Sequence, residues 1–141
     1  RDLVELLEAR VSTDADRLCH TFLRDGESEA ATATFAHARR RALAVAAGLQ
    51  AVAPPGERAL LVYPTGLEYI DAFFGCVHAG MVAVPAYPTD AERLPIAMPR
   101  LCAITRDARP SIGLTTRELL SPLRALASAH PEFAAVHWVA T

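Results

Sequence analysis

The sequence contains no lysine and no asparagine, and all 14 of its basic residues are arginine. Chemistry that requires a lysine amine is therefore excluded within these residues. No apolar run approaches the roughly 18 uninterrupted residues of a membrane-spanning helix, so no transmembrane segment is predicted. The first residues mix charged and apolar side chains, which does not predict a signal peptide. These absences favour a cytoplasmic location.

Short motifs that bind phosphate or metal ions, or that carry out acyl transfer, are also missing. There is neither GxGxxG nor GxxxxGK, and the seven glycines are scattered. The five histidines show no HxxxH or HxH spacing and no cysteine at ligand spacing in the sequence. No Gly-x-Ser-x-Gly element is present. We therefore assign no catalytic, cofactor-binding or metal-ligating residue.

The overall composition is that of a globular protein. Hydrophobic residues make up 52% of the chain and the net charge is −2, which gives no reason to expect a nucleic-acid or anionic-membrane partner. Cys19, Cys76 and Cys102 are odd in number and widely spaced in apolar surroundings. Reduced, buried thiols are the interpretation we favour over a disulfide or a metal-binding pair.

The rest of the chain is organised around residues 58–88. An apolar run at 59–63 predicts a buried strand, and Thr65 and Glu68 have the spacing of a capping box for a helix over 66–79. Gly80 suits the left-handed residue that ends a helix, and 81–84 is a second apolar run. This order predicts a βαβ unit with parallel strands.

The helix over 66–79 carries two adjacent apolar rows. We expect its large side chains to be fully buried, each contributing roughly 1.5–3 kcal/mol, and its small residues to allow close backbone packing. The helix should then be the most buried one, and Gly75→Leu should destabilise the fold. The large residues are Leu67, Ile70, Phe73, Phe74 and Val77, and the small ones are Ala72, Gly75 and Ala79.

The preceding segment predicts helices and a hairpin. Thr34 is placed to cap a long helix whose apolar residues recur to Val52, and the Pro54-Pro55-Gly56 sequence stops it. The other expected elements are a helix over 3–11, a polar connection over 12–16, and strands over 18–23 and 33–35 around a turn at 24–29.

The segment after the βαβ unit continues the alternation of helices and strands. Pro85 should make the second strand leave the sheet, and Pro122 should break or kink the last helix. The expected elements are a helix over 99–108, strands over 111–115 and 136–139, and a helix with leucines from 119 to 126. The fold class is α/β: a hairpin and long helix (1–57), then a βαβαβαβ, mostly parallel sheet with helices on both faces (58–141).

Topology offers a positional argument for a binding site. Ligands of open parallel sheets bind beyond the carboxyl ends of the strands. The candidates there are Tyr63, Thr65, Tyr87 and Thr115, for which strand termination and helix capping are the alternative explanation.

One stretch resembles a known family. Residues 74–88 (FGCVHAGMVAVPAYP) are similar to the second core motif of adenylate-forming enzymes, and together with residues 63–68 (YPTGLE) they most resemble fatty acyl-AMP ligases. Residues 34–38 (TFAHA) match the first core motif loosely, because His37 and Ala38 replace its acidic residue and leucine. The resemblance covers nearly the whole chain but only the first part of such an enzyme.

The resemblance implies a parent function. Such an enzyme uses ATP and Mg²⁺ to convert a fatty acid to an acyl-adenylate and passes the acyl group to an acyl carrier protein, often for polyketide or lipopeptide synthesis. The family's phosphate loop, magnesium-binding glutamate and catalytic lysine fall outside these residues. The chain alone should therefore be an inactive partial N-terminal domain that binds no cofactor, with the remainder of that domain as a partner. The alternatives are an acyl-CoA ligase, an amino-acid adenylation domain, or a free-standing α/β interaction module.

Overall fold

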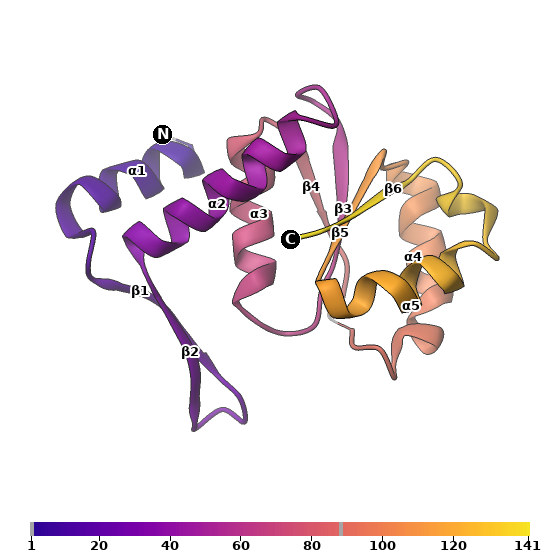
Figure 1. Cartoon of the computed structure of the whole chain (residues 1–141), viewed down its shortest axis with the longest axis horizontal. Helices are drawn as coiled ribbons and strands as arrows, with labels where there is room; N and C mark the ends of the chain where they lie inside the picture. Colours follow the sequence, from indigo (N-terminus) through magenta and orange to yellow (C-terminus); the bar gives the residue numbers. More distant parts are fainter. Residues whose placement is uncertain (1, 88) are drawn as a thin grey trace.

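The computed structural model describes residues 2–87 and 89–141, and its elements form two consecutive parts (Figure 1). The first part contains α1 (Leu3–Asp14), β1 (Leu18–Leu23), β2 (Glu29–Thr34) and α2 (Phe35–Gln50). The second contains β3 (Arg58–Val62), α3 (Leu67–His78), β4 (Val82–Pro85), α4 (Leu94–Ala108), β5 (Ile112–Thr115), α5 (Arg117–Ala127), η1 (Pro131–Phe133) and β6 (His137–Ala140). Pro88, which ends the second core motif, lies outside the described residues.

The second part is built on a parallel four-stranded sheet in the order β4-β3-β5-β6. β3 pairs with β4 from Arg58–Val82 to Leu61–Pro85 and with β5 from Ala59–Ile112 to Val62–Thr115. Helices α2 and α3 cover one face, and α4 and α5 cover the other (Figure 1). The predicted α/β fold with a four-stranded parallel core is confirmed.

The side chains of β3 alternate between two hydrophobic cores. Leu61 and Tyr63 pack with residues of α2 and α3, including Val45 and Cys76. Leu60 and Val62 pack on the other face with residues of α4, α5 and β6, as in a strand that is buried on both faces. β3 is therefore the central strand around which both layers of helices assemble.

Helix α3 is mostly shielded from solvent, but its most deeply buried residues are the small ones. Of its twelve residues, all of them described, only Glu68 is exposed. The buried positions are Ala72, Gly75 and Cys76, of which Gly75 lies against Val45 and Ala42 of α2, whereas the expected core residues Leu67, Ile70, Phe73, Phe74 and Val77 are half-buried. The prediction that these five are fully buried is wrong, because α2 approaches α3 so closely that only small side chains fit between the two helices.

The start of α3 also differs from the prediction. Gly66, with an extended backbone, is the N-cap residue, and no side chain makes the capping hydrogen bond. A Cβ atom at Gly66 would lie 2.8 Å from Glu68 Oε2, so the Glu68 carboxylate lies beside the N-cap. The Thr65–Glu68 capping box is therefore not formed. Gly80, in contrast, adopts the predicted left-handed conformation (φ 73°) after the helix.

Prolines interrupt the second part less than predicted. α4 begins at Leu94 instead of Pro99 and contains Pro99, and α5 continues through Pro122. Pro85 pairs with Leu61, and Ala86 N donates to Leu61 O at 3.0 Å, so the strand does not leave the sheet at Pro85. β4 is an edge strand with Val82 half exposed, and an edge strand tolerates a missing N–H.

In the first part, the hairpin and the long helix are joined directly. Thr34 is both the last residue of β2 and the N-cap of α2, and its Oγ1 accepts from His37 N at 3.2 Å as predicted. α1 extends three residues beyond the prediction, to Asp14, and β2 begins at Glu29 instead of Ala33. α2 ends at Gln50, which leaves Val52 exposed.

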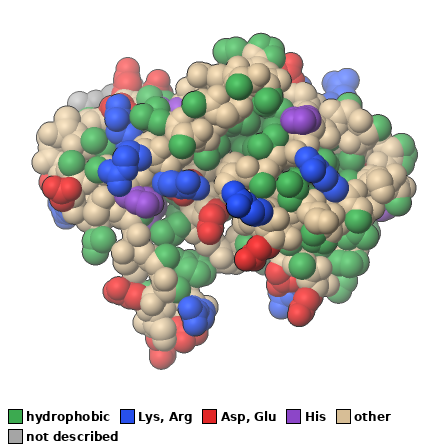
Figure 2. Space-filling model, in the orientation of Figure 1, with side chains coloured by type: hydrophobic (Ala, Val, Ile, Leu, Met, Phe, Trp, Pro, Cys, Tyr) green, Lys and Arg blue, Asp and Glu red, His purple; other side chains and the backbone are tan. Residues whose placement is uncertain are grey.

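The turn of the hairpin is fixed by one carboxylate. Asp25 Oδ1 accepts from the backbone amides of Glu27 and Ser28, and Oδ2 accepts from Ser28 Oγ. These hydrogen bonds lower the pKa of Asp25 to about 2. The hairpin extends away from the body of the molecule (Figure 1), and acidic side chains gather at its tip (Figure 2).

Three further sequence predictions concern the thiols, one histidine and the membrane. All three cysteines are free, with Cys76 and Cys102 buried and Cys19 half-buried. For His78, which falls in the helix predicted over 66–79, the sequence favours a partly buried, hydrogen-bonded histidine over a catalytic one. His78 is half-buried as expected, but its Nε2 atom is buried without a hydrogen-bond partner. None of the helices in the described part of the chain is long and apolar enough to cross a membrane.

Candidate functional site

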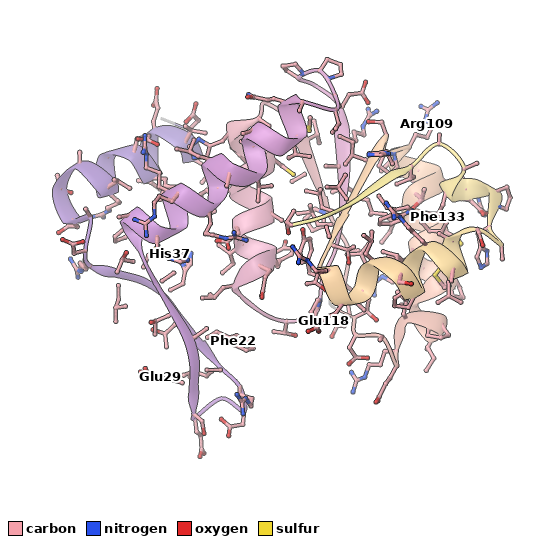
Figure 3. All side chains as sticks on the ribbon, in the orientation of Figure 1. Phe22, Glu29, His37, Arg109, Glu118 and Phe133 are labelled. Carbon is pink, nitrogen blue, oxygen red and sulfur yellow. The ribbon has the colours of Figure 1, made fainter. Side chains whose placement is uncertain are left out.

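A cavity of about 690 Å³ opens where the carboxyl ends of β3 and β4 meet the hairpin. We call it the hairpin crevice. Its walls are Cys19, His20, Thr21 and Phe22 of β1, the residues Pro64, Thr65 and Gly66 after β3, Leu67, Tyr69 and Ile70 of α3, and Ala86 after β4. Figure 3 labels Phe22 on the hairpin, with its side chain directed toward the loop that precedes α3.

The position of the crevice follows from the local sequence. Pro64 and Gly66 separate β3 from α3, so the chain turns sharply at the carboxyl end of the strand. β1 lies opposite this turn because its partner β2 continues directly into α2, which packs on α3. Two segments that are distant in the sequence thus form one concave surface.

The lining of the crevice is mostly apolar with a few polar groups. Cys19 Sγ lies 3.7 Å from His20 Nε2, which is the contact distance of a cysteine–histidine pair. Burial, however, raises the pKa of the Cys19 thiol above its ordinary value. Burial therefore opposes the formation of the thiolate that a nucleophilic cysteine needs.

A second groove lies on the other side of Thr65 and contains more charge. Its lining includes Arg24, His37, Arg41, Glu68 and Asp71. Arg41 Nε contacts Asp71 Oδ2 at 3.2 Å. Burial raises the pKa of Asp71, and the hydrogen bond from Arg41 opposes that shift. Because Arg41 is paired with this carboxylate, it is not available as an isolated cation for a phosphate.

Of the four residues predicted to line a site, Thr65 lies in the hairpin crevice, where it is exposed. Tyr63 is buried in the sheet–helix core, and its Oη lies 2.8 Å from Thr141 Oγ1. Burial raises the pKa of Tyr63. Its ring contacts Tyr69 edge-on, with centroids 6.4 Å apart, so Tyr63 supports a wall of the crevice from behind.

The other two candidates lie apart from the crevice lining. Tyr87 is 70% exposed, and the Arg100 guanidinium lies 5.5 Å from its ring centroid. Thr115 is fully buried at the end of β5, and its Oγ1 has no hydrogen-bond partner. The assignment of all four residues to a binding site stays a prediction.

The hairpin wall of the crevice was missed by sequence reasoning. Residues 18–23 were recognised as a strand, but nothing in their order indicates what they face. The one available signal was the alternation that places Phe22 and His20 on one side of the strand. Their position over the turn after β3 depends on the packing of α2, which is a tertiary feature.

The fold is that of the N-terminal part of a fatty acid AMP ligase from Legionella pneumophila, to which the chain is 30% identical with a TM-score of 0.81. The family model described as AMP-binding enzyme matches residues 7–140, so the chain belongs to this family. It is 41% identical over 138 residues to the medium-chain-fatty-acid–acyl-carrier-protein ligase JamA of Moorena producens, which covers 97% of this chain and 23% of that ligase. The predicted resemblance is confirmed.

Two further relatives belong to the same branch. The long-chain-fatty-acid–AMP ligase FadD23 of Mycobacterium tuberculosis is 35% identical over 118 residues, or 82% of this chain and 20% of that protein. The crystal structure of a fatty acyl-adenylate ligase from L. pneumophila, in complex with acyl adenylate and pyrophosphate, is 32% identical with a TM-score of 0.78. The match covers 98% of this chain and 23% of that one. The chain thus spans about a fifth to a quarter of the length of these relatives.

Proposed function

We propose that this chain is the scaffold-forming first part of an enzyme that activates a fatty acid with ATP. The parent enzyme forms an acyl-adenylate, releases pyrophosphate and passes the acyl group to an acyl carrier protein in the cytoplasm. The observation that carries this proposal is the similarity to fatty-acid ligases, which extends along 97% of the chain at 41% identity for JamA.

The residues described here do not by themselves suit ATP and Mg²⁺. Arg41, one of the two arginines that line the groove beside the crevice, is held by Asp71, and Glu68 lies over the N-cap of α3, where it disfavours a second anion. Adenylation requires donors and cations that meet the charge on the phosphates. We therefore propose no catalytic step for these residues, and we assign ATP and Mg²⁺ to the parent enzyme.

The hairpin crevice has a narrower proposed role. Its apolar walls and its position at the strand ends are suited to holding part of a ligand whose reactive end is bound by the rest of the enzyme. Of the four residues predicted at the strand ends, we propose Thr65 for this role. Tyr63 contributes indirectly through its contact with Tyr69.

Other enzymes of the superfamily are the second possibility. The anthranilate CoA ligase AuaEII and the McyG A-PCP protein complexed with phenylalanyl-adenylate share the fold with TM-scores of 0.72 and 0.81, but at 21% and 19% identity. That level of identity supports the fold alone. The fatty-acid ligases JamA and FadD23, at 41% and 35% identity, favour the fatty acyl-AMP ligase branch over these and over a free-standing interaction module.

ATP–pyrophosphate exchange with medium- and long-chain fatty acids tests the proposal. The parent enzyme should exchange pyrophosphate, and residues 1–141 alone should give no exchange above a heat-treated control. Removing a single hydrogen-bond donor to the charge that develops in the transition state lowers the rate of the catalysed reaction by about 10²–10³. This chain contains no lysine and no recognisable phosphate loop. Exchange by the isolated chain, prepared free of host ligases, would overturn the scaffold assignment. Acyl transfer to coenzyme A and not to a carrier protein would overturn the carrier assignment.

A further inference from the structure

Three side chains with metal-binding chemistry converge away from the hairpin crevice. They are Cys102 of α4, His130 before η1 and Glu132 within η1. One ligand atom from each lies within 4.8 Å of the other two, and among the described residues this is the one such group of three. Cys102 is buried, and His130 and Glu132 are half-buried.

The backbone around the cluster is well fixed. His130 N donates to Ala127 O at 3.0 Å, and His130 O accepts from Phe133 N at 3.2 Å. The His130 ring meets the Phe133 ring edge-on, with centroids 6.5 Å apart, and Phe133 is buried. The imidazole thus has a defined position instead of moving freely on the surface.

Glu132 is positioned by α4. Arg106, one turn after Cys102 on the same helix, places its Nη2 2.6 Å from Glu132 Oε1. A carboxylate has about four lone-pair sites, so one contact with arginine leaves others for a metal. Partners that hold a ligand from outside orient it and tune its charge. The ion pair is therefore compatible with ligation by Glu132.

We propose that Cys102, His130 and Glu132 form a binding site for a divalent transition-metal ion of the zinc type, with water as the fourth ligand. Zinc binds thiolate, imidazole and carboxylate at about 2.0–2.3 Å in tetrahedral geometry, which places ligand atoms roughly 3.3–3.8 Å apart. Side-chain rotations that move the atoms by about 1 Å convert the present spacing to that geometry. Magnesium and calcium do not fit, because they prefer oxygen ligands alone.

The convergence is not explained by the separate structural roles of the three residues. Packing accounts for a buried Cys102, and the ion pair with Arg106 accounts for Glu132. Neither the packing of Cys102 nor the ion pair of Glu132 requires the His130 imidazole to lie close to both the thiol and the carboxylate. A thiolate and a carboxylate also balance the two positive charges of the ion, so a bound metal leaves no net charge at the buried side of the cluster.

The position of the site assigns it a structural role. The cluster connects α4 to the segment that enters β6, on the face of the sheet opposite α3 and the crevice. An ion bound there links two elements that Arg106 and Glu132 already connect. Zinc at a hundred times its dissociation constant should raise the ratio of folded to unfolded protein about a hundredfold, provided that the unfolded chain does not bind it.

Cobalt(II) titration of the 141-residue chain tests the proposal, because a cysteine ligand gives a thiolate-to-cobalt charge-transfer band. We expect this band to saturate at one equivalent and to disappear when zinc is added. Cys102→Ser should abolish the band, and His130→Gln and Glu132→Gln should each weaken binding at least tenfold. The matched controls Cys76→Ala and His137→Gln should bind like the parent.

Two outcomes of the cobalt titration would overturn the site. One is a parent chain with no charge-transfer band at stoichiometric cobalt. The other is a band that persists in Cys102→Ser or is lost equally in Cys76→Ala. Zinc-dependent denaturation provides an independent measurement: zinc should shift the urea midpoint of the parent more than that of Glu132→Gln. The amide of this variant has the shape of the carboxylate, and its oxygen can still accept from Arg106 Nη2, so an equal shift in both proteins would also refute the proposal.

Discussion

Helices α2 and α3 approach each other closely at Gly75, and this contact leads to the sharpest stability prediction. A Cβ atom added to Gly75 would lie 2.5 Å from Val45 Cγ1, 2.6 Å from Val45 Cβ and 3.3 Å from Ala42 O. Restoring an ordinary contact of 3.4 Å would require the two helices to separate by about 0.9 Å. Even alanine is therefore too large at this position.

Two opposing effects determine the size of the loss. Replacing a glycine inside a helix by alanine stabilises the helix by about 0.8–1.0 kcal/mol. Overpacking a closed interface typically costs about 1–3 kcal/mol, and the clash here is with atoms close to the backbone. Gly75→Ala should therefore lower the free energy of unfolding by about 1–2 kcal/mol. Gly75→Leu adds three more carbons to the same interface and should lower it by about 3 kcal/mol or more.

Urea denaturation, followed by circular dichroism and by fluorescence of the single tryptophan, measures the effect. Gly48→Ala on α2 is the matched control, because its Cβ would meet nothing within 4 Å and it should gain about 0.5–1 kcal/mol. Adding Val45→Ala should rescue Gly75→Ala only partly, since Val45 Cβ remains. If Gly75→Ala were as stable as Gly48→Ala, the close contact of α2 with α3 would be refuted.

Three other contacts in the sheet lead to measurable expectations. Gly113→Ala would place a methyl group against the Trp138 ring and should cost about 1–3 kcal/mol with a red-shifted emission; an unchanged spectrum would contradict the contact. Tyr63→Phe removes the hydrogen bond to Thr141 and should lower the free energy of unfolding by about 0.5–1.5 kcal/mol, whereas an unaltered urea midpoint would show that this bond contributes nothing. Burial raises the pKa of Cys76 to about 12, above an unfolded value of about 8.5. The contribution of the protonated Cys76 thiol to the free energy of unfolding should therefore be complete below pH 8.5 and decline as the pH rises toward 12. The urea midpoint of Cys76→Ala should accordingly fall less steeply with pH than that of the parent.

Much of the fold could be predicted because its signals are local. The apolar run of β3, the capping residue Thr34 and the left-handed Gly80 each act through residues within a few positions in the sequence. These signals place elements in order, and the alternation of strands and helices then determines the parallel sheet.

Packing overrode the local signals at the prolines. Pro99 was predicted to begin α4, but Leu94 and Met98 are buried against the sheet, and their burial favours a helix that starts earlier. Pro85 was predicted to end the pairing of β4, but that strand lies at an edge, where the missing N–H is tolerated. Neither the depth of burial nor the position of an edge can be read from neighbouring residues.

The two surfaces with possible chemistry were predictable only in part. Strand-end topology led to Thr65 in the hairpin crevice, whereas the opposing wall at Phe22 depends on how α2 packs. Cys102 and His130 are 28 residues apart, so no sequence spacing brings them together. Their proximity arises because α4 and η1 pack against each other, which only the folded chain shows.

The direct junction at Thr34 limits how this region can change in length. Because no residue separates β2 from α2, one residue inserted after Thr34 would rotate the hairpin by about 100° around the helix axis and remove β1 from the crevice. At the tip, Gly26 has open space around it, and residues added there would leave the wall in place. Length variation among related chains should therefore be concentrated at the tip of the hairpin and absent at its base.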